Sequence, residues 1–355
     1  MKIKIFTKHT KIAASSRLRT FQYLDHLKQN QLNVVMPLFD EEYLETFYRK
    51  KKKSKLIIVK KYLERLFQIF SLKKSELIII EKELFPWVPF PIEALLSKLG
   101  FKYIVDYDDA IFHKYDLHKN YVIRKLLSNK INSIMKSSSA CICGNAYLEK
   151  KALKSGAKLT KYIPTVVDIE RYTSKKNYAL SEKIVIGWVG SPSTSRYLES
   201  LRNIFKKLST EYQFKLVVVG ADFQCDEVEV ENIPWSEDSE AKTIIDFDVG
   251  IMPLLDSPWE KGKCGYKLIQ YMASGVPVIA SDIGVNKSIV EDSGSGFVVD
   301  SEVSWLNAFR NLFDSEVLRA KKGINGRKSV ERKFSVQVQS LVYRELIDEV
   351  QIKMS

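Results

Sequence analysis

Short apolar stretches alternate with longer amphipathic stretches in the first half of the chain. The short stretches are bounded by charge and predict buried strands, whereas the long ones repeat apolar residues every three or four positions, as helices do. We expect strands at residues 2–6, 32–39, 76–82, 102–110 and 139–145. We expect helices at residues 15–29, 55–70, 91–100 and 122–138.

The same alternation returns in the second half. We expect strands at residues 183–191, 214–220, 248–254 and 276–281, with a further strand or turn at 294–299. We expect helices at residues 195–211 and 267–275, and a helical tail from about Asp314 onward. Because alternating strands and helices build parallel sheets covered by helices, the sequence predicts an α/β protein with two doubly wound, Rossmann-like sheets.

A polar stretch without periodicity separates the two halves. The chain has 355 residues, more than one domain usually holds, so we expect two domains. The N-terminal domain is expected at residues 1–165, a linker at 166–183 and the C-terminal domain at 184–334. Residues 335–355 are expected to form a C-terminal helix that packs back on the N-terminal domain.

The net charge of +13 lies entirely in the first half of the chain. Residues 1–150 hold 28 Lys and Arg against 15 Asp and Glu, whereas residues 151–355 hold 28 of each. Residues 49–74 concentrate bases around one acid, Glu64, and their apolar positions fit an amphipathic helix lying on an anionic membrane surface. A solvated helix face is the plain alternative. Nucleic acid is not expected, because no nucleic-acid motif accompanies the patch.

The compartment follows from what the sequence lacks. No apolar run approaches the roughly 18 residues of a transmembrane helix, and the first residues alternate like a strand instead of forming the apolar block of a signal peptide. We therefore expect a cytoplasmic protein that is peripheral on the inner face of the membrane. The cysteine spacing suits neither a disulfide framework nor a metal site, so buried thiols are expected at Cys141, Cys143, Cys225 and Cys264.

Two loops at expected strand ends have unusual chemistry, and strand ends are where doubly wound proteins bind ligands. In GWVGSPSTSRYL, Gly190 ends a strand and Ser191 leads into a helix whose first N–H groups suit a phosphate. Arg196 stands in the first turn of that helix, where a cation opposes the helix dipole unless an anion lies beside it. An ordinary turn with a solvated arginine is an equally open interpretation.

The second loop begins the segment GKCGYKLIQYMASGVPVIAS, residues 262–281. Gly265 precedes a helix that starts with Tyr266 and Lys267, so a cation again stands at a helix start. Gln270 lies one turn further along the same face. One element could therefore hold a diphosphate at its start and a hydroxyl-rich group near Gln270. A packed amphipathic helix is the plain alternative.

Several segments occur in an order that resembles family 4 (group 1) glycosyltransferases of GT-B architecture. GWVGSPST, DFDVGIMPL, GKCGYKLIQYMASGVPVIAS and SGFVV resemble the C-terminal domain of that family. SSRLR, IVDYDDAIF and GNAYLEKKALKSGAKLTKYIPTVVDIERY resemble its N-terminal domain and interdomain segment. The resemblance spans nearly the whole chain. It implies two Rossmann-like domains facing across a cleft, a nucleotide-sugar donor held mostly by the C-terminal domain, and no metal or other cofactor.

The resemblance also assigns donor-binding residues. It places the donor diphosphate on the two loops, at Gly190, Ser191, Arg196, Gly265, Tyr266 and Lys267. It places the nucleoside near the segment NIPWSE and the following helix, at Pro234, Trp235, Ser236 and Gln270. Trp235 packed in the core is an equally open interpretation. Family members often carry two glutamates where this chain has Gly262 and Gln270, which leaves open how the sugar is held; Glu260 could replace the first.

The segment DYDDA supplies the candidates on the acceptor side. Asp108 falls about where relatives place an active-site histidine, so the resemblance implies that it acts in catalysis with Arg196 and Lys267. The acceptor side is expected to include Ser16, Arg17, Asp106, Asp109 and His113. Asp106 and Asp109 could instead be structural, capping helices or binding Arg17 and Arg19, and His113 could be a solvated loop residue.

Family 4 enzymes retain the anomeric configuration, and the leaving diphosphate is thought to accept the proton of the acceptor. The resemblance therefore implies a retaining glycosyltransferase that moves a sugar from a nucleotide-diphosphate donor to a glycan or lipid-linked glycan in surface polysaccharide biosynthesis. Arg196 and Lys267 would stabilise the charge that develops on the leaving group. A non-catalytic GT-B protein that binds a glycan or a nucleotide is the alternative.

Overall fold

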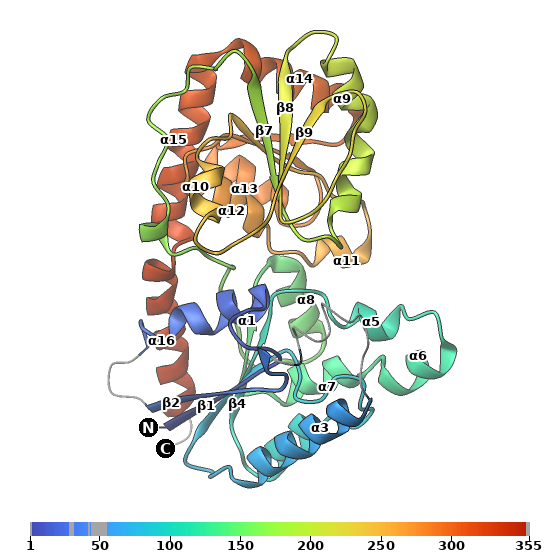
Figure 1. Ribbon diagram of the computed structural model, residues 1–355. Helices are drawn as coiled ribbons and strands as arrows, with labels where there is room; N and C mark the ends of the chain where they lie inside the picture. Colours follow the sequence, from blue (N-terminus) through green and yellow to red (C-terminus); the bar gives the residue numbers. More distant parts are fainter. Residues whose placement is uncertain (1, 28–31, 42, 44–54, 353–355) are drawn as a thin grey trace. The chain divides into compact units, whose positions relative to one another are not determined.

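The chain forms two compact units, Met1–Thr165 with Gln339–Ser355, and Val166–Val338, hereafter unit 1 and unit 2 (Figure 1). The computed structural model describes residues 2–27, 32–41, 43 and 55–352. Each unit is built on one six-stranded sheet whose strands all pair in parallel. The α/β class and the two doubly wound sheets expected from the sequence are confirmed.

The sheet of unit 1 has the strand order β2-β1-β3-β4-β5-β6. Its strands are β1 (Lys2–Thr7), β2 (Leu32–Pro37), β3 (Leu77–Glu81), β4 (Tyr103–Tyr107), β5 (Ala140–Cys143) and β6 (Thr160–Tyr162). β3 and β4 are buried along their whole length, because runs such as LIIIE are apolar on both faces. Register pairs Ile3 with Leu77 and Ile78 with Tyr103.

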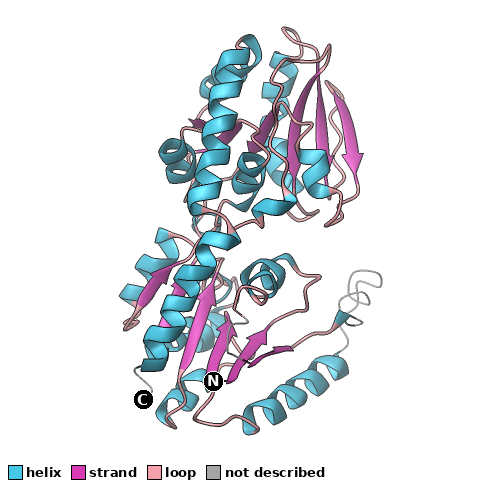
Figure 2. Cartoon of the chain, turned by 90° about the vertical axis from the view of Figure 1, so that its left-hand side faces the viewer, coloured by secondary structure: helices cyan, strands magenta, loops and turns pink. Residues whose placement is uncertain are grey.

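Helices cover this sheet (Figures 1 and 2). They are α1 (Ala14–Arg19), the 3-10 helix η1 (Phe21–Tyr23), α3 (Lys55–Phe70), α4 (Ile92–Lys98), α5 (His113–Asp116), α6 (Tyr121–Leu127), α7 (Lys130–Ser137) and α8 (Ala146–Lys154). Most of α16 (Val336–Ile352) also belongs to unit 1, where the Tyr343 ring lies 5.1 Å from the Tyr23 ring.

The sheet of unit 2 has the strand order β12-β11-β10-β7-β8-β9. Its strands are β7 (Ile184–Val189), β8 (Phe214–Val219), β9 (Glu229–Ile233), β10 (Val249–Met252), β11 (Val278–Ser281) and β12 (Gly296–Val299). Consecutive residues of a strand point into different hydrophobic clusters: Trp188 of β7 belongs to one cluster and Val189 to the other. This alternation places one hydrophobic layer on each face of the sheet.

The helices of unit 2 follow the strands in turn. They are the 3-10 helices η2 (Ile169–Arg171) and η3 (Ser195–Leu201), and α9 (Arg202–Leu208), α10 (Glu240–Ile244), α11 (Pro258–Lys261), α12 (Tyr266–Ala273), α13 (Asn286–Ser293), α14 (Glu302–Asp314) and α15 (Glu316–Lys333). Residues 166–183, expected as a linker, lie within this unit: Val167 bridges to Ser335 and Tyr172 is buried. None of the helices in the described ranges is long and apolar enough to cross a bilayer.

Three expected helices differ from those observed. The helix expected at 15–29 ends at Arg19, because Thr20 leaves the helical region with φ −125°, and residues 28–29 lie outside the described part. The helix expected at 122–138 divides into α6 and α7. The helix expected at 195–211 begins as the 3-10 helix η3. All four cysteines are buried free thiols, as the sequence predicted.

Candidate functional site

The first loop of interest leaves β7 at Gly190, whose N–H donates to the Val219 carbonyl at 2.9 Å. A Cβ at Gly190 would lie 2.2 Å from the Trp188 ring and 2.9 Å from Lys267 Nζ, so only glycine fits here. The loop then turns back on itself: the Ser191 N–H donates to Thr194 Oγ1 at 3.0 Å. The structure thus brings the two sequence-predicted loops together at the carboxyl end of β7.

The second loop places Lys267 at the start of α12. Gly265, the residue before the helix, has φ +67°, and a Cβ there would lie 2.4 Å from the Ile289 side chain. Lys267 Nζ lies 4.3 Å from the centroid of the Trp188 ring and makes no ion pair or hydrogen bond within the described part of the chain. Burial, and then repulsion by Lys263, lower the pKa of Lys267 to about 7. This ammonium group therefore lacks a counter-charge.

The other predicted cation, Arg196, is held by a buried carboxylate. Arg196 Nη2 lies 3.3 Å from Glu260 Oε1, and the Arg196 side chain is 62% exposed, whereas that of Glu260 is 3% exposed. Tyr197 donates its hydroxyl to Glu260 at 2.6 Å, and the Ser257 hydroxyl donates to it as well. Burial raises the pKa of Glu260, but the hydrogen bonds from Ser257 and Tyr197 outweigh burial and lower it. Glu260 thus orients Arg196.

The residues predicted to hold the nucleoside form a hydrogen-bonded network in unit 2. Gln270 is 2% exposed, and its Nε2 donates to the Tyr172 hydroxyl at 3.2 Å. Tyr172 donates to Glu240 Oε1 at 3.1 Å, and the indole N–H of Trp235 donates to the same carboxylate. Trp235 is 37% exposed, so it is not a core residue. Pro234 and Ser236, beside it, are exposed.

Sequence reasoning missed Tyr172 and Glu240. Tyr172 lies in the stretch expected to be a linker, and Glu240 lies among exposed acids of the segment WSEDSE. A lone tyrosine and one acid among several carry no periodic signal, so only the fold reveals that both are buried and that Tyr172 links Glu240 to Gln270.

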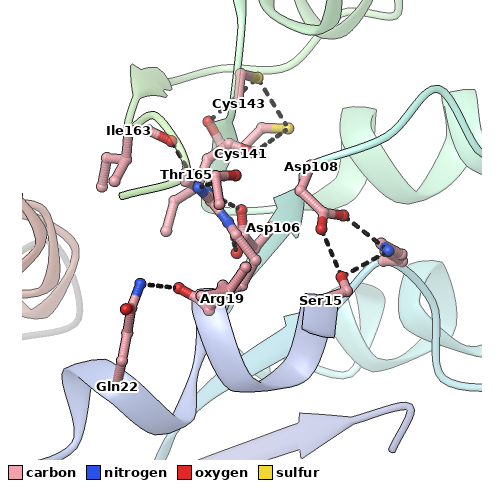
Figure 3. A network of polar contacts seen from close by, with 12 residues as sticks. Ser15, Arg19, Gln22, Asp106, Asp108, Cys141, Cys143, Ile163 and Thr165 are labelled. Carbon is pink, nitrogen blue, oxygen red and sulfur yellow. Dashed lines mark hydrogen bonds and ion pairs between the residues drawn. The ribbon is translucent and has the colours of Figure 1, made fainter. Parts of the chain in front are cut away.

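In unit 1, Asp106 is committed to Arg19 (Figure 3). Both side chains are buried, and Asp106 accepts from Arg19 Nε at 2.9 Å and from Arg19 Nη2 at 2.6 Å. Arg19 Nη1 also donates to the Ile163 carbonyl at 2.9 Å. Ser16 is fully buried and donates to Glu81 at 2.7 Å. Asp106 and Ser16 are thus bound to buried groups of unit 1, which for Asp106 is the structural role left open by the sequence.

Asp108 is held in a different way. Ser15 donates to its Oδ2 at 2.5 Å, and Lys82 Nζ lies 2.7 Å from its Oδ1 (Figure 3 labels Ser15 and Asp108). Burial raises the pKa of Asp108, but the positive charges of Lys82 and Arg19 outweigh burial and lower it to about 2. Lys82 adopts φ +65°, a strained conformation for a lysine that commonly marks functional sites. Sequence reasoning missed both Lys82 and Ser15.

The remaining acceptor-side candidates have different surroundings. His113 is half-buried with both ring nitrogens engaged, at 2.8 Å from Asp116 Oδ1 and 2.8 Å from the Tyr147 hydroxyl, so it is not a solvated loop residue. Arg17 donates to the main-chain carbonyls of Lys11 and Ile12 at 3.4 Å and 3.5 Å, and Asp109 is half-buried after β4. Within the described ranges, no group of three or more His, Cys, Asp or Glu is placed to hold a metal ion.

Comparison with known proteins places these sites in context. Residues 183–315 match the sequence profile described as "Glycosyl transferases group 1". The capsular polysaccharide biosynthesis glycosyltransferase CapM of Staphylococcus aureus is 27% identical over 259 residues, 67% of this chain and 63% of CapM. Matches to curated relatives cover 55–63% of those proteins, less than two thirds of their length.

Solved structures share the fold over nearly the whole chain. Sucrose-phosphate synthase from Thermosynechococcus elongatus has a TM-score of 0.70 at 15% identity, covering 99% of both chains. Anabaena HepE in complex with UDP-glucose has a TM-score of 0.72 at 14% identity, covering 98% of this chain and 100% of HepE. At these identities the similarity concerns the fold, and it confirms the GT-B architecture expected from the sequence.

Proposed function

Residues 183–315 belong to the group 1 glycosyltransferases, and on this basis we propose that the chain transfers a sugar from a nucleotide-diphosphate donor to a glycan or lipid-linked glycan. We further propose that transfer retains the anomeric configuration and serves surface polysaccharide biosynthesis. The name of CapM, which refers to capsular polysaccharide, and the UDP-glucose complex of HepE support these assignments.

The single observation that carries the proposal is the unpaired ammonium group of Lys267. A half-buried cation without a counter-charge is costly, and the lowered pKa of Lys267 records that cost. A diphosphate beside Lys267 Nζ would supply the missing charge. A Cβ at Gly190 would lie 2.9 Å from Lys267 Nζ, so glycine at this position lets the loop backbone lie close to the ammonium group. The start of α12, which follows Gly265, would offer main-chain N–H groups to phosphate oxygens.

In this reaction, unit 2 would stabilise the leaving diphosphate. Negative charge grows on that group as the bond to the sugar breaks, and Lys267 with Arg196 offers positive charge there. Glu260 holds Arg196 from one side through a 3.3 Å contact, while most of the Arg196 side chain stays exposed and can reach a phosphate. Glu260 would then position Arg196 for the diphosphate, and Lys267 would be the cation that the bound diphosphate stabilises most.

The acceptor would lie on unit 1 beside Asp108. With a pKa of about 2, Asp108 is ionised at neutral pH and a poor proton acceptor. We therefore assign to it a fixed negative charge that accepts a hydrogen bond from an acceptor hydroxyl. The proton itself would go to the leaving diphosphate, and Ser15 and Lys82 would keep the carboxylate in place.

One observation favours the non-catalytic alternative. Both usual glutamate positions lack a carboxylate, and Gln270 is already bonded to Tyr172. Incubation with a panel of nucleotide sugars separates the two functions, because a transferase releases the nucleoside diphosphate by transfer or slow hydrolysis. Binding of a donor without release, in the presence of bacterial lipid-linked glycans, would support the binding protein instead.

We also propose that α3 places unit 1 on the anionic inner face of a membrane. The expected basic segment spans residues 49–74, of which 49–54 lie outside the described residues. Along α3 an apolar stripe faces solvent, with exposures of 83%, 57%, 52%, 73% and 82% at Leu56, Val59, Leu63, Phe67 and Phe70. Exposed lysines at positions 60, 73 and 74 accompany the stripe. Apolar side chains beside lysines fit an interface with anionic lipid headgroups.

The opposite face of α3 shows why the stripe points outward. Arg65 is 1% exposed, and its Nη2 donates to the carbonyls of Thr7 at 2.9 Å and Met36 at 3.0 Å. Its guanidinium group lies 4.8 Å from the centroid of the Phe6 ring. These contacts fix the rotation of the helix about its axis, so the apolar stripe is held facing solvent.

A further inference from the structure

Three lysines follow the carboxyl ends of three adjacent strands in unit 1. Lys8 follows β1, Lys82 follows β3, and Lys114 lies in α5 after β4; these strands are neighbours in the sheet. Because parallel strands end at the same edge of a sheet, the three ammonium groups gather there. Burial, and then repulsion by Lys114 and Lys82, lower the pKa of Lys8 to about 8.

The carboxylates around Lys8 are engaged with other groups. Glu83 lies 2.6 Å from the ammonium group of Lys130, and Asp108 lies 2.7 Å from that of Lys82. Glu81 accepts from the main-chain N–H of Lys8 at 3.1 Å and from Ser16 at 2.7 Å. Within the described residues, Lys8 Nζ makes no ion pair. Lys8 is therefore a cation at this edge that has no described carboxylate bound to its ammonium group.

The next two residues, His9 and Thr10, have buried polar atoms without described partners close to these lysines. His9 Nδ1 and Thr10 Oγ1 are buried, and neither atom has a hydrogen-bond partner within the described structure. Burial, and then the charges of Lys8, Lys82 and Lys114, lower the pKa of His9 to about 3, with no carboxylate acting against them. Buried polar atoms without a partner are uncommon in folded proteins, and beside three lysines the local charge favours an anionic partner.

We infer that Lys8, Lys82 and Lys114 form a subsite for an oxyanion of the acceptor, either a phosphate of a lipid carrier or the carboxylate of an acidic sugar. The inference rests on the proposed function, because that function assigns the acceptor to unit 1. Lys82 bridges Asp108 and Ser15, at 2.7 Å and 2.8 Å, so the subsite adjoins the carboxylate proposed to meet the acceptor hydroxyl. An acceptor would thus be aligned by its anionic group while its hydroxyl faces Asp108.

Competitive acetylation of the full chain, read lysine by lysine by mass spectrometry, tests the subsite. An oxyanion stabilises the ammonium form and so slows acetylation of the neutral amine. We expect inorganic phosphate to slow acetylation of Lys8 and Lys114 about fivefold relative to chloride at equal ionic strength. Exposed Lys11 serves as the matched control and should not respond. Equal slowing at Lys8 and Lys11, or none at Lys8, would overturn the inference.

Further arms identify the source of the oxyanion and keep the two proposals apart. Stronger protection by phosphate points to a lipid carrier, and stronger protection by glucuronate points to an acidic sugar. The variant Lys114→Gln alters an exposed residue, so it should fold normally and should weaken the protection of Lys8. Protection of Lys267 by a nucleoside diphosphate reports on the donor site in the same spectra. If Lys8 is protected and Lys267 is not, the proposed donor function fails while the oxyanion subsite stands.

Discussion

At the scale of single residues, the ammonium group of Lys267 is the feature on which the donor site depends. It lies over the Trp188 ring, next to Gly190, with no counter-charge in the described structure. Cation–π contact compensates part of its lost hydration, while burial, and then repulsion by Lys263, lower its pKa to about 7. A ligand with negative charge therefore gains more at this position than at a solvated lysine.

Replacing Lys267 with Ala is expected to weaken binding of a nucleoside diphosphate about 10- to 100-fold. The variant removes a charge-assisted hydrogen bond, which contributes about 1.5–3 kcal/mol. Calorimetric titration measures the change, and the variant Lys242→Ala, which alters an exposed lysine of the same unit, is the control. Equal affinities of the wild type and Lys267→Ala would mean that this lysine is a structural residue only.

Donor affinity is expected to fall as the pH rises above about 7. A bound diphosphate stabilises the ammonium form, so the pKa of Lys267 is higher in the complex than the value of about 7 in the free protein. Between these two values binding takes up a proton, and affinity drops by up to about tenfold per pH unit. Below pH 7 the lysine is charged in both states and contributes no slope.

Titrations between pH 7 and 9.5 measure this dependence. The variant Lys267→Arg is the control, because arginine stays charged throughout this range and should give a flat profile. A slope that persists in Lys267→Arg would assign the dependence to another group.

The sequence predicted part of the candidate site and missed the rest for a physical reason. Gly190, Arg196 and Lys267 stand at strand ends or helix starts, so periodicity alone locates them. Lys82 and Glu240 act through contacts with residues distant in sequence, at positions 108 and 172 respectively. No local pattern carries such a contact, which arises only when neighbouring strands and helices bring the residues together.

At the scale of elements, α3 shows that a periodic apolar pattern can predict a helix without predicting which of its faces is buried. The apolar period predicted the helix at residues 55–70, and the structure begins and ends it there. The same period says that one face is apolar, but not whether that face points inward. Arg65 decides the matter, because its hydrogen bonds to the ends of β1 and β2 hold its own side of the helix, which also carries buried Ile69, against the sheet.

Replacing Phe67 and Phe70 with Ser is expected to reduce binding to anionic vesicles about tenfold or more. Each aromatic side chain buried in a bilayer interface contributes on the order of 1 kcal/mol or more. Both are largely exposed, so the melting temperature should hardly change. Co-sedimentation with vesicles measures binding, and Val317→Ser, at an exposed position of unit 2, is the control. Undiminished binding of the double variant would remove α3 from the membrane surface.

The buried pair Arg19–Asp106 joins α1 to β4, and its loss is expected to destabilise unit 1. Replacing Arg19 with Ala leaves a carboxylate buried without its partner, which costs about 3–5 kcal/mol. Urea denaturation followed by circular dichroism measures the loss. Arg310→Ala breaks a similar two-bond contact with Glu211 on the surface and should shift the unfolding midpoint little. Similar shifts in both variants would contradict this account of Arg19.

Two strands escaped prediction because they lack an apolar run. β9 (Glu229–Ile233) lies at the edge of its sheet with no buried residue, and three of the five residues in its sequence EVENI are acidic or polar. β6 (Thr160–Tyr162) is also an edge strand, and with three residues it is too short to show alternation. Edge strands need only one partner, so their sequences are less constrained than those of β3 or β4.

At the scale of the whole molecule, the alternation of strands and helices was sufficient to predict two doubly wound sheets. It was not sufficient to assign residues 166–183, because a stretch without regular structure can still be packed in a core. Tyr172 and Tyr178 lie in that stretch, and both are buried in unit 2. Arg327 donates to the carbonyls of Tyr172 and Ala273, each at 2.6 Å, and so fastens the stretch to α12.

The most direct test of the donor assignment is a crystal structure of the chain with the nucleoside diphosphate that binds it most tightly in a panel of all common bases. We expect phosphate oxygens to lie within hydrogen-bond distance of Lys267 Nζ and of the backbone at Gly265 and Tyr266. A diphosphate seated elsewhere in unit 2, with Lys267 still unpaired, would contradict this expectation, as would the failure of every nucleoside diphosphate to bind.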